Sequence, residues 1–154
     1  MDIEKAEAWM KEALLEAHKS EAEGEVPVGA VVLLNEKIIG RGHNSSIRLH
    51  DPSAHAEILA LRQAARNISN YRIPGSVMIV TIEPCVMCIG AVIIARLPRV
   101  VFGAREPRTG ACESVFAIPN EPRLMHRVAV IGGVEEARCR ELMQRFFAER
   151  RPAM

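Results

Sequence analysis

Alternation between apolar and polar residues divides the first third of the chain into a helix and a hairpin. In residues 3–17, apolar side chains recur every three or four positions, which predicts an amphipathic helix that ends before Gly24. Two short apolar runs follow within residues 26–44, joined at the polar pair Asn35 and Glu36. Apolar runs separated by two turn residues are typical of a β-hairpin.

The middle of the chain carries the signals of a second helix and a buried strand. Asp51 and Pro52 form a cap-and-proline pair, which predicts a helix from there to about Ala65. Residues 76–82 are continuously apolar over the length of a strand, and Pro84 stops that run. Pro84 can also open the next helix, which we expect to end near residue 95.

The last third alternates again between apolar runs and a helix. Short buried strands are predicted at 99–104 and 127–133, and the final helix follows within 132–150. Strands separated by helices tend to run parallel, so this order predicts one mixed sheet with helices on both faces. The Pro-containing segment 107–122 is a long loop, where binding residues are common. We expect a single domain over residues 1–154.

Composition places the chain among ordinary globular proteins. Its 154 residues are 49% apolar and 25% charged, and the formal net charge of +1 argues neither for nor against a nucleic-acid partner. The first 20 residues lack the apolar core of a signal peptide, and no apolar run is long enough for a membrane span. We therefore expect a cytoplasmic location, with reduced or metal-bound thiols at the four cysteines, 85, 88, 112 and 139.

The pair Cys85-x-x-Cys88 is open to a redox, a structural-metal or a catalytic-metal interpretation. A structural zinc site uses four protein ligands, whereas a catalytic site uses three and leaves one position for water. No second Cys-x-x-Cys or His-x-x-x-His pair exists to close a four-ligand site, and His55 is the best-placed further ligand. One histidine and two cysteines favour a site with an open position.

Glu57 stands two residues after His55, at the start of the second predicted helix. Side chains at a helix N-terminus lean toward its end and can converge there. Zinc lowers the pKa of a bound water to about 7, and a neighbouring carboxylate can move that proton to a substrate. Glu57 is therefore a candidate general acid and base.

His55-Ala56-Glu57 followed by Pro84-Cys85-x-x-Cys88 resembles the signature of the zinc-dependent nucleoside and base deaminases. That resemblance implies an α/β fold of the cytidine-deaminase type, a three-layer αβα sandwich around a mixed five-stranded sheet. Longer stretches are similar to the bacterial tRNA-specific adenosine deaminases, namely VPVGAV, HDPSAHAEILALRQA, TIEPCVMCIGA and RVVFGAREPRTGA.

The resemblance implies roles for individual residues. One zinc per subunit would be bound by His55, Cys85 and Cys88, with Glu57 as the proton shuttle for hydrolysis of adenosine to inosine. The target nucleoside would contact the side chains or backbone of Asn44, Val28, Ala54 and Pro84.

The resemblance also implies tRNA as the substrate, with the adenosine at the wobble position of an anticodon stem-loop, and a homodimeric enzyme. The loop residues assigned to RNA are Arg105, Glu106, Arg108 and Thr109, and Glu106 stands where the family usually has aspartate. At the C-terminus, basic and aromatic side chains suit single-stranded RNA, and we assign Phe147, Arg150 and Arg151 to it.

Two other functions use the same residues. A deaminase of free bases or nucleosides, such as cytosine, guanine or cytidine, would need the zinc centre but not the basic loop and C-terminus. A non-catalytic zinc-binding module or a thiol redox protein would retain its function without Glu57.

Overall fold

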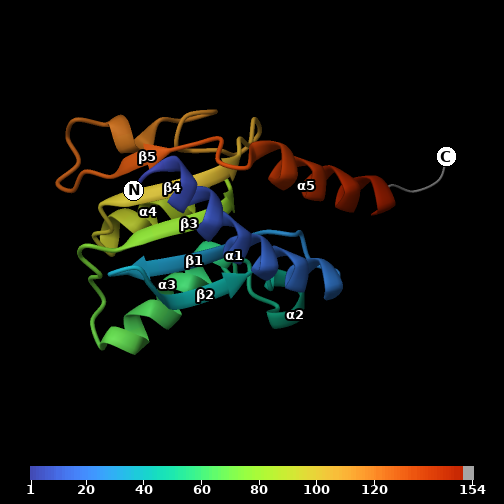
Figure 1. Ribbon diagram of the computed structural model, residues 1–154, viewed down its shortest axis with the longest axis horizontal. Helices are drawn as coiled ribbons and strands as arrows, with labels where there is room; N and C mark the ends of the chain where they lie inside the picture. The colour runs from blue at the N-terminus through green and yellow to red at the C-terminus, as the bar shows by residue number, and fades with distance from the viewer. Residues whose placement is uncertain (151–154) are drawn as a thin grey trace.

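The computed structural model describes residues 1–150, which form a five-stranded sheet with helices on both sides (Figure 1). Its elements are, in chain order, α1 (Ile3–Ala22), β1 (Gly29–Leu34), β2 (Lys37–His43), α2 (Ser46–Leu49), α3 (Ala56–Ile68), β3 (Val77–Ile82), α4 (Val86–Ile94), β4 (Arg99–Ala104), the 3-10 turn Ile118–Asn120, β5 (Ala129–Ile131) and α5 (Glu136–Arg150).

The strands lie in the order β2-β1-β3-β4-β5. β1 is antiparallel to both of its neighbours, whereas β3, β4 and β5 run parallel. It follows that β2, β3 and β4 all point the same way and end at the same edge of the sheet. In open α/β sheets this carboxyl edge is where ligands bind.

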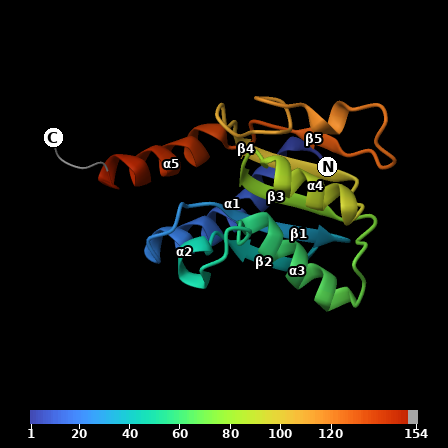
Figure 2. The ribbon, with the colours of Figure 1, turned by 180° about the vertical axis from the view of Figure 1, so that it is seen from behind.

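Two helices cover each face of the sheet. α3 and α4 pack on one face, over alternate strand residues such as Ala30 and Val80, and α1 and α5 pack on the other, over Val31 and Ile79. Figure 2 shows α3 and α4 in front of the sheet, and Figure 1 shows α1 in front with α5 extending past the sheet edge. The predicted three-layer αβα sandwich is confirmed.

The predicted hairpin is also confirmed, and its turn and strands require unusual backbone. Asn35 and Glu36 both have positive φ, 52° and 60°, the conformation that a two-residue hairpin turn needs. In β2, a Cβ added to Gly42 would lie 2.3 Å from the carbonyl oxygen of Ala56. Glycine there lets the first turn of α3 approach the strand closely.

The predicted start of the second helix at Asp51 was wrong. α3 begins at Ala56. The Asp51 carboxylate instead accepts hydrogen bonds from the backbone N–H and the hydroxyl of Ser53, at 2.9 and 2.7 Å, which stabilises a local turn. Aspartate favours such turns for the same reason that it favours helix caps, so the sequence signal fits both. The shift places His55 just before the helix rather than inside it.

The other differences from the prediction are small. Part of the loop between the hairpin and α3 forms the short helix α2, and the fifth strand covers only Ala129–Ile131. Among residues 1–150, none of the helices combines the length and apolar composition that crossing a bilayer requires.

Candidate active site

Three potential metal ligands meet at the carboxyl edge of the sheet. His55 is the N-cap of α3 and Cys85 the N-cap of α4, and neither side chain caps its own helix. The Nδ1 atom of His55 lies 3.7 Å from the Sγ of Cys85 and 3.5 Å from that of Cys88. Tetrahedral zinc with ordinary bond lengths separates nitrogen and sulfur ligands by about 3.6 Å. The His55 nitrogen therefore already has the spacing from both sulfurs that zinc requires, and the three donor atoms all lie within 4.8 Å of one another.

The pKa values of the two cysteine thiols are shifted in opposite directions. The pKa of Cys85 is lowered to about 4 by a hydrogen bond from Cys88, and His55 lowers it further against the effect of burial. The pKa of Cys88 is raised by the same hydrogen bond and by burial. This asymmetry favours the thiolate form of Cys85, and a divalent cation that displaces the proton of Cys88 can bind both sulfurs. This donor set fits zinc.

Glu57 lies in the first turn of α3 and is buried, with 3% of its surface exposed. Burial raises the pKa of its carboxyl group, although its own backbone N–H and His55 act in the opposite direction. A carboxylate with a raised pKa accepts a proton more readily than an ordinary glutamate does. Its environment suits the proton-transfer role predicted from the sequence.

Asn44 has a structural role in addition to its predicted contact with substrate. The N–H of Ala56 donates to its Oδ1 at 2.8 Å, so Asn44 caps α3 from twelve residues away in the sequence. Because Oδ1 is occupied by the cap, the amide nitrogen of Asn44 is the group left to donate to a ligand in the pocket that it lines.

A pocket of about 240 Å³ opens beside the metal ligands. Of the predicted site residues it is lined by Val28, Asn44, His55, Glu57, Cys85, Glu106 and Thr109. Ala54 and Pro84 do not line it. Both are buried, and their carbonyl oxygens accept hydrogen bonds from the N–H groups of Ser45 and Ala111. Their predicted contact with substrate remains a prediction.

The sequence reasoning missed four residues of the pocket wall, namely Val26, Ile82, Glu83 and Met143. Val26 and Ile82 each lie two positions from a residue already assigned to the site, Val28 and Pro84. This proximity in the sequence was the signal that could have identified them. Met143 comes from α5, and nothing local in the sequence links that helix to the zinc ligands. Glu83 was not assigned to the site, although a glutamate directly after a buried strand and two residues before a cysteine ligand was a usable signal.

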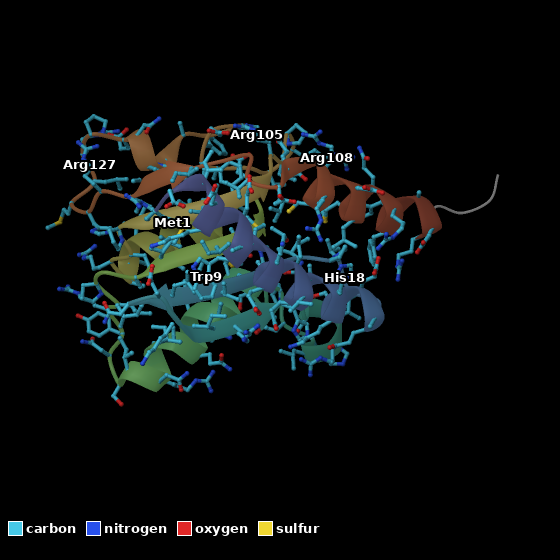
Figure 3. The ribbon with its side chains drawn as sticks, viewed as in Figure 1. Met1, Trp9, His18, Arg105, Arg108 and Arg127 are labelled. Atoms are coloured by element: carbon cyan, nitrogen blue, oxygen red, sulfur yellow. The ribbon has the colours of Figure 1, made fainter. Side chains whose placement is uncertain are left out.

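The predicted RNA-binding loop lies at the same edge of the molecule as the start of α5, where Figure 3 shows Arg105 and Arg108. Arg105 is held by Glu113 at 2.5 Å and by Glu136 at 2.9 Å. Arg108 is exposed, and its backbone N–H donates to the Glu106 side chain. Arg108 is therefore freer to contact phosphate than Arg105.

At the C-terminal end of α5 the two phenylalanines differ as their adjacent positions predict. Phe146 is buried and Phe147 is 47% exposed. The guanidinium of Arg150 stacks on the Phe146 ring, with 3.6 Å between the guanidinium carbon and the ring centre. Arg151 lies outside the described residues.

Comparison with known proteins gives consistent matches. A family model described as the cytidine and deoxycytidylate deaminase zinc-binding region matches residues 3–104. The tRNA-specific adenosine deaminase of Haemophilus influenzae is 47% identical over 146 residues, covering 94% of this chain and 84% of that protein. The enzyme of the same name from Bacillus subtilis is 41% identical over 145 residues, covering 94% and 90%.

The fold agrees with a solved structure as well. A structure from a study of A-to-I editing by tRNA:A34 deaminases at the wobble position of transfer RNA superposes with a TM-score of 0.83. It is 38% identical to this chain, with 86% of this chain and 96% of that chain covered.

Proposed function

The chain belongs to the cytidine and deoxycytidylate deaminase family and, within it, to the tRNA-specific adenosine deaminases, and we propose that it converts adenosine to inosine in tRNA. The observation that carries the proposal is the zinc-spaced set of His55, Cys85 and Cys88 beside the buried carboxyl group of Glu57. The reaction takes adenosine and water to inosine and ammonia.

The residues of the site divide the chemistry between them. His55, Cys85 and Cys88 would hold the zinc, which would supply a water molecule activated for attack on C6 of adenine at neutral pH. Glu57 accepts the proton that the water releases and delivers it to N1 of the base. The same carboxylate then takes the proton of the new C6 hydroxyl group and passes it to the amino group, which leaves as ammonia. Asn44 donates from its amide nitrogen to the target nucleoside.

The anticodon stem-loop is the proposed RNA element, with the adenosine at the wobble position. Support comes from the relatives' names, from exposed Arg108, which is next to the pocket residue Thr109 in the chain, and from exposed Phe147, one helical turn after the pocket residue Met143. A pocket of about 240 Å³ admits a base only after it has left its stack, which an anticodon loop allows at little cost.

The enzyme is further proposed to be a homodimer that pairs through α4. This helix leaves Val86, Met87 and Ile94 exposed at 51%, 37% and 67%, with open space at Gly90 between them. The spacing puts these residues along one stripe, directly beside the zinc ligands on the same helix. The wild-type protein should have the mass of a dimer in light scattering, and Ile94→Glu should give a monomer. A monomeric wild-type protein would exclude the dimer.

The function is tested with a stem-loop that carries adenosine at the wobble position, alongside free adenosine, cytidine and guanine. Inosine should form in the stem-loop alone, whereas turnover of only a free base or nucleoside would contradict the tRNA assignment.

Glu57→Gln should retain its zinc and its melting temperature while activity falls by at least about 10²–10⁴-fold. Full activity in that folded, zinc-loaded variant would exclude the proton-shuttle role and favour a non-catalytic zinc module.

A further inference from the structure

Glu83 is a buried carboxylate with an unusual number of hydrogen-bond donors around it. Only 2% of its surface is exposed. Its oxygens accept from the backbone N–H groups of Glu106, Cys112, Glu113 and Ser114, at 3.1, 3.1, 2.9 and 2.9 Å, and from the hydroxyl group of Ser114. A carboxylate offers about four lone-pair positions, so these donors leave it no free acceptor for a substrate or a metal.

All of these donors belong to the segment 106–114. Further contacts of this segment also lie at Glu83 and Pro84. The N–H of Ala111 donates to the carbonyl oxygen of Pro84 at 2.9 Å. A Cβ added to Gly110 would lie 2.3–2.5 Å from the carboxylate atoms of Glu83. The loop therefore wraps around Glu83 closely enough that this position has no space for a larger residue.

The loop anchored in this way forms part of the pocket. Glu106 and Thr109 line the pocket together with Cys85, which lies two residues after Glu83. The segment Glu83-Pro84-Cys85 thus holds a zinc ligand at one end and the pocket wall at the other. Loss of this anchor would let the wall move away from the substrate and weaken its binding, while the zinc ligands stay in place.

We propose that Glu83 is a positioning residue for the RNA substrate: its buried carboxylate fixes residues 106–114 so that Glu106 and Thr109 form a pocket wall in register with the zinc ligands. The proposal rests on the proposed function, because it assigns the loop to the substrate of that reaction. Glu83 acts through the loop and does not itself touch the reacting atoms.

The test compares Glu83→Gln with the wild-type protein on the adenosine stem-loop. The amide nitrogen of glutamine donates and would face backbone donors, so the loop should lose its anchor while the side chain keeps its size. KM should rise roughly ten- to a hundredfold, kcat should change far less, and the zinc content should stay the same. Unchanged KM in the folded variant, or a fall in kcat at unchanged KM, would overturn the proposal.

Gly110→Ala tests the same contact from the loop side and leaves Glu83 intact, which keeps the test valid if Glu83→Gln fails to fold. It should raise KM in the same way, and the double variant should show much less than the sum of the two effects, because both changes break one contact. Full additivity, or wild-type KM in Gly110→Ala, would contradict the proposal.

The matched control is Glu16→Gln, which removes a buried carboxylate whose partners Lys19, Arg41 and His43 do not line the pocket. It should cost stability and leave KM and kcat unchanged. A wild-type protein that does not deaminate the stem-loop would refute the proposed function. An active wild-type protein with KM unaltered by either loop substitution would refute only the role of Glu83.

Discussion

Substitutions at Asn44 should separate helix capping from substrate binding, because its side-chain oxygen caps a helix and its side-chain nitrogen is available to the substrate. Oδ1 accepts from the N–H of Ala56 at 2.8 Å, whereas the amide nitrogen is the group available to the pocket. Asn44→Ala removes both functions. Asn44→Asp keeps the oxygen acceptor and places a negative charge at the N-terminus of α3, where it is favourable.

The two variants should therefore differ in stability and agree in activity. Loss of the cap costs about 1 kcal/mol, which for a chain of this length lowers the melting temperature by roughly 2–4 °C in Asn44→Ala. Asn44→Asp should melt at or above the wild-type temperature. Loss of a buried donor to the substrate costs about 1–3 kcal/mol, so kcat/KM on the stem-loop should fall roughly 10- to 100-fold in both.

Thermal melts monitored by circular dichroism and stem-loop kinetics at saturating zinc provide the two measurements. The control is Asn67→Ala, which removes an exposed amide that donates to the Ile39 carbonyl far from the pocket and should leave kcat/KM unchanged. Wild-type activity in Asn44→Asp would show that the amide nitrogen does not contact the substrate. An unchanged melting temperature in Asn44→Ala would show that the cap contributes nothing to stability.

Three further predictions concern the scaffold and the RNA. Gly42→Ala should cost about 1–3 kcal/mol and lower zinc occupancy, because its Cβ would push the Ala56 carbonyl and the start of α3 away; melting temperature and bound zinc measure this. Burial raises the pKa of Glu16, but the hydrogen bonds and charges of Lys19, His43 and Arg41 together lower it below the ordinary 4.5. Its stabilising effect is therefore present above pH 4.5 and lost as the pH falls through the lowered pKa, and urea titrations between pH 3 and 6 should show a flatter acid limb in Glu16→Gln. Stem-loop affinity should weaken with salt, and Arg108→Ala should reduce the slope of log K against log salt by about 1; an unchanged slope would remove Arg108 from the RNA contacts.

The sequence predicted the features that depend on local pattern. Hydrophobic periodicity placed the hairpin, the parallel strands and most helix ends correctly, and ligand counting brought His55 together with the two cysteines. The start of α3 was predicted too early because Asp51 stabilises a turn and the true cap, Asn44, is distant in sequence.

The rest of the site depends on contacts that no local pattern reports. Met143 reaches the pocket only because α5 lies beyond the ends of β3 and β4, and Glu83 shows its role only when the donors of residues 106–114 surround it. The sequence could place these residues on a helix or at a strand end, but their partners are 20 or more positions away.

The pocket consists of two parts with different tolerance to change. Its floor carries the zinc ligands at two helix starts, held by backbone packing as close as that at Gly42. Two parts of its wall come from the 106–114 loop and from α5, neither of which supplies a zinc ligand. Variation in those walls can therefore alter which nucleotide or flanking sequence is accepted while the reaction chemistry stays intact, so libraries for new substrate specificity belong in the walls rather than the floor.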